Sequence, residues 1–493
     1  MMMKCGEVQN VNNFQQNENE LLEVFLNHAL FNEKRNYTTP QCTNVTFGNP
    51  SFPEGLGVEL IVRPECNQQC EYCYVYQHGH ELYPMAERVD NATILKNLRA
   101  FLNYCFNTKK TLINRWELFA GDLFYDNLYF DILDVFYEII KPIYLTYHHL
   151  FTDNKGITIL TPSNCSFIHD DSKLKKFEEY FAKMQSIGVR LVISYSTDGK
   201  YAVDSREKYD VPDEFYDKAF AFLKKHNYGP HPMISAENID NYIQNFDWWV
   251  EQVPKINDDK SLPMFLEVRN NNWTPEKIDK YVDLLKHIYE YTKKKYTTKE
   301  DLAAHLFGKE HRTGYDIIRL VPRTAGYQDT GRYSCSMQWL VSVTLNNLNI
   351  VPCHRTTYPQ FRIGRFVQNE NGDIVDIEGK NVYLGITIHG FKANALPKCA
   401  NCDYAQGCLY GCLGSQFETS GELFAPIPCV CDLHKKKIQT LSKLYQDDGL
   451  LDIALEKQHI DKNTYNLYKG WAQEEKEAKP WIQILKNNTL LSN

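Results

Sequence analysis

Short apolar runs alternate with amphipathic stretches between residues 57 and about 292. An apolar run predicts a strand, and apolar residues at three- and four-residue spacing predict a helix. The expected strands are residues 57–63, 115–119, 157–160, 189–194, 231–235 and 264–269. The helix-like stretches between them include residues 91–106, 172–187, 213–225 and 275–291. This alternation predicts an α/β fold in which helices cover parallel strands, and six such units fit a partial (β/α)6 barrel of the TIM type.

Polar or special residues follow each expected strand, and barrels of this kind gather their active sites at the carboxyl ends of the strands. After the first strand comes a loop with three cysteines. The segments after the other five strands are 120–122, 161–165, 194–199, 235–237 and 270–272. We therefore expect these segments to surround one site.

The pattern changes after residue 292, and four parts are expected along the chain. Residues 1–56 form an N-terminal extension that is polar at its start, and residues 57–292 form the barrel. Residues 325–436 form a module with many cysteines, short strands and Gly/Pro turns, and residues 437–493 form a helical tail. In the tail, the apolar stripe consists of Ile438, Leu441, Leu444 and Tyr445.

Composition narrows the class of protein. A chain of 493 residues suggests two or three domains. Its 43% hydrophobic and 24% charged residues are typical of soluble globular proteins. No apolar run is long enough to cross a bilayer, and the first twenty residues lack the apolar region of a signal peptide, so we expect a cytoplasmic protein without a membrane partner. The net charge of 54 minus 62, or −8, disfavours nucleic acid as a partner.

Fifteen cysteines without a secretion signal indicate reduced thiols and bound metal rather than disulfides. Cys66, Cys70 and Cys73 follow the first strand in the spacing C-x3-C-x2-C. A [4Fe-4S] cube has four irons that are usually held by cysteine thiolates, so three cysteines in one loop leave one iron open. A zinc knuckle or a redox thiol loop is the alternative, because both use the same residue type.

This spacing, with Tyr72 beside the last cysteine, resembles the radical S-adenosylmethionine (SAM) superfamily. The resemblance implies that the amino and carboxylate groups of SAM chelate the open iron. An electron from the cluster then splits SAM into methionine and a 5′-deoxyadenosyl radical, which abstracts hydrogen from the substrate. An external electron donor of the flavodoxin or ferredoxin type is implied as well.

A second group of cysteines reads C-x2-C-x5-C-x3-C and resembles the SPASM extension, which binds two auxiliary [4Fe-4S] clusters in some radical SAM enzymes. Carried over by position, the resemblance assigns Cys335, Cys353 and Cys412 to the first auxiliary cluster and Cys399, Cys402, Cys408 and Cys431 to the second. Cys429 competes with Cys431 as the late ligand, and the other of the two would complete the first cluster. If neither of them completes the first cluster, that cluster has an open coordination position or a fourth ligand that is not a cysteine. Structural zinc is the alternative for this group too.

One position departs from the SPASM pattern. The family usually has a glycine five residues before the second cysteine of the upstream pair, whereas this chain has Leu348. Asn346 and Asn347 are expected to turn a hairpin there, because Asn tolerates left-handed backbone.

Two segments resemble the SAM contacts of the family. Ala120, Gly121 and Asp122 match the Gly-Gly-Glu sequence that receives the amino group of SAM. The segment from Ile193 to Gly199, followed by Arg206, resembles the Ser-Ile-Asp-Gly-Pro…Arg segment of the sulfatase-maturase branch. The match places Ser194 or Ser196 near the ribose and Arg206 near the SAM carboxylate.

The resemblance implies an oxidoreductase that modifies a peptide or protein. The leading hypothesis is a maturase that crosslinks or oxidises a side chain of a ribosomally made precursor (a RiPP), with leader recognition by a separate protein or by an N-terminal helix near residues 20–31. The second hypothesis is a formylglycine-generating sulfatase maturase. Those relatives have an aspartate base after the cysteine that corresponds to Cys353, and here that residue is His354. A non-catalytic iron-sulfur or zinc protein is the third, and no catalytic residue is assigned.

Overall fold

The structure is a computed structural model that describes residues 9–31, 35–38, 57–119, 121–151, 156–202, 206–207, 213–257, 262–308, 317–320, 340–390, 396–408 and 411–473. Its strands are β1 (Gly57–Ile61), β2 (Gln69–Cys70), β3 (Arg115–Phe119), β4 (Ile157–Ser163), β5 (Val189–Tyr195), β6 (Arg206–Glu207), β7 (Met233–Ile234), β8 (Leu266–Glu267), β9 (Leu340–Thr344), β10 (Asn349–Val351), β11 (Gly364–Gln368) and β12 (Ile374–Gly379). Its α-helices are α1 (Gln9–Ala29), α2 (Tyr74–Leu82), α3 (Asn91–Asn103), α4 (Leu128–Tyr147), α5 (Asp171–Gln185), α6 (Asp213–His226), α7 (Tyr242–Ile256), α8 (Pro275–Lys295), α9 (Lys299–Phe307), α10 (Val382–Gly390), α11 (Pro397–Ala400), α12 (Leu413–Ser420), α13 (Pro428–Asp447), α14 (Leu450–Glu456) and α15 (Lys462–Trp471).

The largest sheet has the strand order β12-β11-β10-β9-β1-β3-β4-β5. Strands β1, β3, β4 and β5 are parallel and follow chain order, whereas β9 to β12 pair antiparallel with one another. Strands β7 and β8 form a parallel pair of their own, and a parallel bridge between Tyr195 and Pro230 connects them to the end of β5. All six expected strands are present, and the mixed α/β class with a mainly parallel sheet is confirmed.

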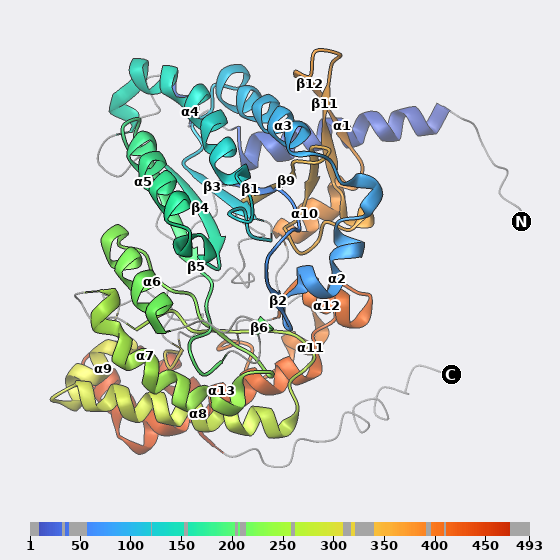
Figure 1. Ribbon diagram of the computed structural model, residues 1–493. Helices are drawn as coiled ribbons and strands as arrows, with labels where there is room; N and C mark the ends of the chain where they lie inside the picture. Colours follow the sequence, from blue (N-terminus) through green and yellow to red (C-terminus); the bar gives the residue numbers. More distant parts are fainter. Residues whose placement is uncertain are drawn as a thin grey trace, which may run out of the picture.

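Burial explains why these segments form strands. Every residue of β1 is buried, as expected for a central strand covered on both faces. Val58 and Leu60 belong to the main apolar core together with Leu98 of α3. Helices α3, α4 and α5 cover one side of the sheet (Figure 1). The residues of the site are therefore expected on the face of β1 that is turned away from these three helices.

The cysteine-rich module does not have a separate sheet. Its first strand, β9, pairs parallel with β1, so the hairpin of β9 and β10 continues the sheet of the first module. The module also contains more helix than its sequence pattern predicts, because α10, α11 and α12 lie within it and α13 begins at Pro428. The predicted domain boundaries stay predictions, but the strands on the two sides of residue 325 share hydrogen bonds.

The β9–β10 hairpin is present as predicted, although a different residue makes its turn possible. Leu348 has the left-handed backbone, with φ of 57°, and neither Asn346 nor Asn347 has a positive φ. The Leu348 N–H donates to the oxygen of Thr344 at 2.8 Å and so closes the turn. The position where the family has glycine therefore keeps the conformation that suits glycine, while its leucine side chain is buried.

The described part of the predicted tail, residues 437–473, consists mainly of helices α13, α14 and α15. Its apolar stripe lies on α13, where Ile438, Leu441 and Tyr445 are buried and Leu444 is partly buried. Helix α13 packs against α8, and α1 packs along β12 at the edge of the sheet (Figure 1). Among the described helices, none is both long and apolar enough to cross a membrane.

Candidate functional site

The first three cysteines lie in one loop at the carboxyl end of β1. The Cys73 N–H donates to the oxygen of Cys70 at 2.9 Å, which makes the tight turn that a two-residue spacing requires. The Gln68 N–H approaches the sulfur of Cys66 at 3.4 Å. Cys66 is exposed, and Cys70 and Cys73 are partly exposed. Three thiols therefore lie in one loop within reach of solvent, which suits ligands of a cluster that receives a further molecule.

Burial around its sulfur raises the pKa of the Cys66 thiol to about 12. The Gln68 N–H opposes this shift, whereas the charges of Asp122, Cys70 and Cys73 add to it. A metal that binds here must displace the proton, because thiolate is the form that ligates.

The loops after the neighbouring strands hold the cysteine loop in place. The Gly121 N–H donates to the oxygen of Arg63 at 2.9 Å, and the Asp122 N–H donates to the oxygen of Glu65 at 2.8 Å. After β4, the Asn164 side chain donates to the Asn67 side chain at 2.7 Å. The carboxyl ends of β1, β3 and β4 lie at one edge because the strands are parallel, and this brings the three loops together.

A second attachment comes from the segment after β5. Cys70 pairs with Arg206 in the short ladder of β2 and β6. The Tyr72 hydroxyl lies 3.0 and 2.9 Å from the two oxygens of the Asp198 carboxylate. Asp198 is buried and also accepts from the Met233 N–H at 3.1 Å. Tyr72 therefore anchors the cysteine loop to the segment after β5 and to the start of β7.

Gly121 is required for contact with the cysteine loop. A Cβ atom on Gly121 would lie 2.0 Å from the oxygen of Glu65, where no side chain fits. The glycine therefore lets the chain after β3 touch the residue before Cys66. A contact between Gly121 and SAM stays a prediction, and Ala120 lies outside the described residues.

The Asp122 carboxylate is engaged in the protein interior. Asp122 is 2% exposed and accepts from the Phe124 N–H, the Ser163 hydroxyl and the Asn164 N–H, each at 2.9 Å. Burial raises its pKa, although the three hydrogen bonds oppose the shift. Its predicted contact with the SAM amino group stays a prediction, and that contact would require the carboxylate to release some of these donors.

Ser194 lies on β5 and is partly exposed, on the face opposite the buried Ile193 and Tyr195. Ser196 follows the strand, and its N–H donates to the oxygen of Ser163 at 2.8 Å. The Arg206 backbone lies beside Cys70, and its side chain is outside the described part of the chain. All three residues lie at the end of the sheet that carries the cysteine loop, and their SAM contacts stay predictions.

The cysteines of the C-terminal module fall into neighbouring groups. Cys353 and Cys399 belong to one apolar cluster, and Cys408 packs against it. The charge of Cys412 acts on Arg355, two residues after Cys353. Cys335 lies outside the described residues, so the first auxiliary set is only partly placed.

Cys429 and Cys431, both on the first turn of α13, have different neighbours. The Cys429 thiol lies 3.6 Å from the oxygen of Asn270, in the segment after β8. Burial raises the pKa of Cys431, Lys398 and Lys435 oppose the shift, and the charge of Cys402 adds to it. Cys431 is therefore the one that lies near a member of the predicted second set.

Within the described ranges, no three His, Cys, Asp or Glu side chains converge on a point where a single ion would bind. The ligands of a cube each bind a different iron, so they need not converge in this way. In the loop after β1 the donor set consists of three thiols at one exposed turn, and that chemistry fits a [4Fe-4S] cluster.

The sequence reasoning missed a buried polar network behind the loop. Glu59 of β1 is 1% exposed and accepts from the Ser342 hydroxyl and the His354 N–H, both at 2.7 Å. The His354 Nδ1 lies 2.7 Å from the other Glu59 oxygen, and the His354 ring stacks on Phe119 with centroids 4.0 Å apart. Burial raises the pKa of Glu59, but the charge and hydrogen bonds of His354 outweigh it and lower the pKa. The sequence signal for this network is Glu59 itself, a glutamate within the apolar run of the first strand.

No protein-family model matches the sequence, and no curated protein matches it either. Among solved structures, anSMEcpe with bound AdoMet has 14% identity and a TM-score of 0.49, over 85% of this chain and 100% of that chain. A structure of anSMEcpe with bound AdoMet and the Cp18Cys peptide has 14% identity and a TM-score of 0.48, over 81% and 99%. SuiB of Streptococcus suis, bound to S-adenosylmethionine, has 13% identity and a TM-score of 0.40, over 76% and 77%.

These neighbours are radical SAM enzymes, the superfamily whose cysteine motif this chain resembles. Their TM-scores lie below 0.5, so the likeness is distant. The function is therefore inferred from the residues of this chain.

Proposed function

We propose that this protein is a radical SAM enzyme with a SPASM-like C-terminal module that abstracts hydrogen from a peptide side chain and thereby crosslinks or oxidises it. The observation that carries this proposal is the C-x3-C-x2-C loop at the carboxyl end of β1, where the loops after β3, β4 and β5 meet it. A partial (β/α)6 barrel is the finer form of the fold that we propose, with β7 and β8 completing the series after the bridge at Tyr195.

In this proposal, Cys66, Cys70 and Cys73 hold a [4Fe-4S] cluster, and Tyr72 orients their loop through Asp198. When bound, the cluster and SAM supply the electron and the radical. The protein selects the hydrogen to be removed by holding the peptide in one position. The partly exposed Ser194 is available for polar contact with the cofactor at the same end of the sheet.

The C-terminal module is proposed to hold two auxiliary clusters. We assign Cys431 to the second set because it lies near Cys402, and we leave Cys429 out because its thiol contacts Asn270. The continuous sheet supports a fixed distance between the two modules, which suits electron transfer between clusters.

A peptide substrate is proposed because SPASM-bearing relatives mostly act on peptides or proteins. We further propose a flavodoxin- or ferredoxin-type donor and leader recognition by a separate protein or by α1, which packs along the sheet edge at β12.

One observation favours the second candidate function, a formylglycine-generating sulfatase maturase. His354 follows Cys353 and is held by Glu59 through its Nδ1 and stacked on Phe119, so its ring has one orientation. Its Nε2 is then directed away from Glu59 and is available to a substrate. Because Nδ1 faces Glu59, Nε2 is the ring nitrogen that would accept a proton from a substrate.

The first test is iron content and SAM cleavage under anaerobic conditions. We expect about twelve irons per chain in the reconstituted protein, as three cubes require. The Cys70→Ala variant should lose about four irons and all formation of 5′-deoxyadenosine. Cys105→Ala is the matched control, because Cys105 is buried in the core away from any cluster. Zinc in place of iron, or undiminished cleavage by Cys70→Ala, would contradict the proposal.

The assignment of the late ligand has its own test. Cys431→Ser should lose about four irons, whereas Cys429→Ser should keep about twelve. The opposite result would reverse the assignment of these two cysteines.

The substrate class is tested by incubation with SAM, a reductant and candidate peptides, followed by mass spectrometry. A loss of two hydrogens from a precursor peptide supports the leading function. Conversion of sulfatase-type Cys or Ser peptides to the aldehyde supports the second. Formation of 5′-deoxyadenosine without change in any peptide would count against both.

A further inference from the structure

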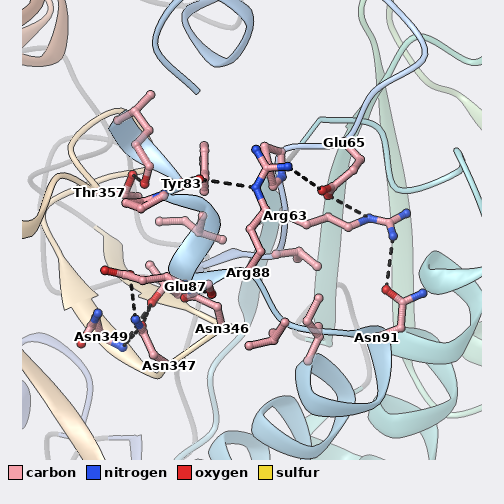
Figure 2. A pocket seen from close by; sticks show the side chains of 18 of the residues that line it. Arg63, Glu65, Tyr83, Glu87, Arg88, Asn91, Asn346, Asn347, Asn349 and Thr357 are labelled. Atoms are coloured by element: carbon pink, nitrogen blue, oxygen red, sulfur yellow. Dashed lines mark hydrogen bonds and ion pairs between the residues drawn. The ribbon is translucent and has the colours of Figure 1, made fainter. Parts of the chain in front are cut away.

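A cavity of about 110 Å³ lies at the root of the cysteine loop, outside the network of Glu59 and His354. It is bounded by the end of β1, by the segment from Leu82 to Val89, by the start of α3 and by the turn of the β9–β10 hairpin (Figure 2). Ile61, Val62, Leu82 and Ile94 supply its apolar lining. The space is sufficient for a side chain or a chain terminus.

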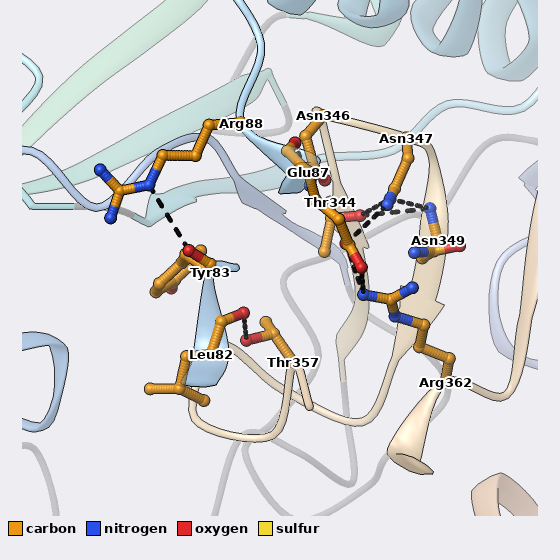
Figure 3. A network of polar contacts seen from close by, with 10 residues as sticks. All are labelled: Leu82, Tyr83, Glu87, Arg88, Thr344, Asn346, Asn347, Asn349, Thr357 and Arg362. Carbon is orange, nitrogen blue, oxygen red and sulfur yellow. Dashed lines mark hydrogen bonds and ion pairs between the residues drawn. The ribbon is translucent and has the colours of Figure 1, made fainter. Parts of the chain in front are cut away.

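Three arginines and two glutamates line this cavity. Arg362 and Glu87 form a close ion pair, in which Arg362 Nη2 lies 2.6 Å from Glu87 Oε1. Asn347 also donates to Glu87, at 3.1 Å, and so ties the pair to the hairpin (Figure 3). Arg362 and Glu87 therefore neutralise each other and form a fixed wall.

The other two arginines share one distant carboxylate. Arg63 Nε lies 3.9 Å from Glu65, and Arg88 Nη1 lies 3.6 Å from the same side chain (Figure 2). Charge-assisted hydrogen bonds are shorter, about 2.7–2.9 Å. Glu65 is 39% exposed, so it stands between the two cations without binding either closely.

Both guanidinium groups keep donors toward the cavity. The two oxygens of Asp126 lie 2.8 Å from Nη1 and Nη2 of Arg63, and Asn91 accepts from Nη1 at 3.2 Å. The buried Nε of Arg63 has no hydrogen-bond partner among the described residues. Arg88 is 37% exposed, and its Nε reaches the oxygen of Tyr83 at a long 3.4 Å (Figure 3). Arg63 Nε and Arg88 Nη1 therefore have only the Glu65 carboxylate nearby, at 3.9 and 3.6 Å, and a ligand carboxylate could bind both more closely.

We propose that this cavity binds a carboxylate of the substrate peptide between Arg63 and Arg88. The inference that the ligand is a peptide rests on the proposed function. The inference that it carries a carboxylate rests on the two arginines. Glu65 moves aside into solvent when the ligand carboxylate takes the shorter contacts. The aliphatic carbons next to the carboxylate lie on Ile61, Val62 and Leu82. Glu65 directly precedes Cys66, so the peptide is anchored beside the loop that carries the three thiols.

The carboxylate can come from an acidic side chain or from the C-terminus of the peptide. Four short peptides separate these sources: acetyl-Leu-Glu-amide against acetyl-Leu-Gln-amide, and acetyl-Gly-Leu acid against its amide. Binding is measured by isothermal titration to the anaerobically reconstituted full chain, with sodium acetate as a simple anion. We expect at least one acid to bind tenfold or more tightly than its amide, and the tighter pair identifies the source.

Arg88→Gln should abolish the preference for the acid, and Arg88→Lys should keep part of it. The matched control is Arg99→Gln, because Arg99 is a half-exposed arginine that pairs with Glu138 away from the cavity. Thermal unfolding of each variant verifies that it is folded. Acids and amides that bind equally, acetate that binds as tightly as the peptides, or an unchanged preference in Arg88→Gln would overturn the proposal. SAM cleavage by the unaltered protein, measured in parallel, shows separately whether the proposed function holds.

Discussion

Two single residues illustrate how closely the backbone is packed around the site. Gly121 touches the oxygen of Glu65 at a distance that excludes any side chain, and Leu348 keeps a left-handed turn in which a glycine would be relaxed. At the first position the lack of a Cβ atom is essential. At the second the buried leucine side chain offsets the cost of its backbone, which is about 1–2 kcal/mol.

The substitution Gly121→Ala should displace the cysteine loop, because the added Cβ would lie 2.0 Å from the oxygen of Glu65. A displacement near 1 Å can reduce catalysis about a hundredfold. We expect a loss of that order in 5′-deoxyadenosine formation, measured by chromatography. Gly79→Ala is the matched control, because its nearest neighbour is the Val75 Cγ1 at 4.0 Å. Equal activity of the two variants would contradict the role given to Gly121.

His434 should make stability depend on pH. Burial, followed by the charge of Arg269, lowers the pKa of His434 from 6.5 to about 3, although Glu267 opposes the shift. The folded protein therefore keeps this ring neutral, while the unfolded chain takes up a proton below pH 6.5. Stability from this residue is present above that pH and is lost as the pH falls toward the folded value, by up to about 1.4 kcal/mol per pH unit.

His434→Gln should accordingly flatten the decline in the free energy of unfolding between pH 6.5 and pH 5, measured by urea titration at each pH. The exposed His80 serves as the control in His80→Gln, which should keep the slope of the unaltered protein. A slope that His434→Gln leaves unchanged would show that other groups cause the decline.

At the scale of elements, short irregular segments do the work of holding the cysteine loop. The ladder of β2 and β6 is two residues long, and the buried Asp198 connects Tyr72 to Met233 at the start of β7. The Asp198 carbonyl accepts from Asn245 and Trp249 of α7, at 2.6 and 3.2 Å. The loop is therefore tied to three elements that follow it by more than a hundred residues.

Tyr72→Phe should weaken this attachment, because it removes the hydroxyl that binds a buried carboxylate. A hydrogen bond to a charged group contributes about 1.5–3 kcal/mol, and we expect the free energy of unfolding to fall by that amount. Tyr76→Phe is the control, because Tyr76 is 53% exposed on α2. Equal unfolding curves for the two variants, followed by tryptophan fluorescence, would refute the anchoring role.

At the scale of the whole molecule, a buried ion pair joins helix α13 to strand β8. Lys437 of α13 lies 2.5 Å from Glu267 of β8, and the Tyr281 hydroxyl of α8 lies 2.5 Å from the same oxygen. Burial raises the pKa of Glu267, but the charges of Lys437 and Arg269 outweigh it and lower the pKa. Helix α13 is thus joined to β8 by charge and to α8 by packing.

Lys437→Met should destabilise the protein by about 3–5 kcal/mol, because it leaves the Glu267 carboxylate buried without its cation. The double variant Lys437→Met with Glu267→Leu should recover most of this loss, since both charges are then absent. A double-mutant cycle of unfolding free energies measures the coupling. Additive losses in the two single variants would indicate that the pair contributes nothing.

The sequence by itself determined the six parallel strands, the helices between them, the cysteine motif and the hairpin at residues 346–348. Each of these depends on neighbouring residues, so a local pattern of apolar positions or cysteine spacing is enough to reveal it. The local pattern also indicated that a cysteine-rich module follows these strands.

Only the tertiary structure decided which distant residues meet. Glu59 and His354 are 295 residues apart, β9 lies beside β1, and Arg63 lies opposite the turn of the hairpin. The donors around Asp122 and the neighbours of Cys429 and Cys431 were decided in the same way. Periodicity shows which face of an element is buried, but the partner on that face depends on how the whole chain is packed, and no local pattern records that.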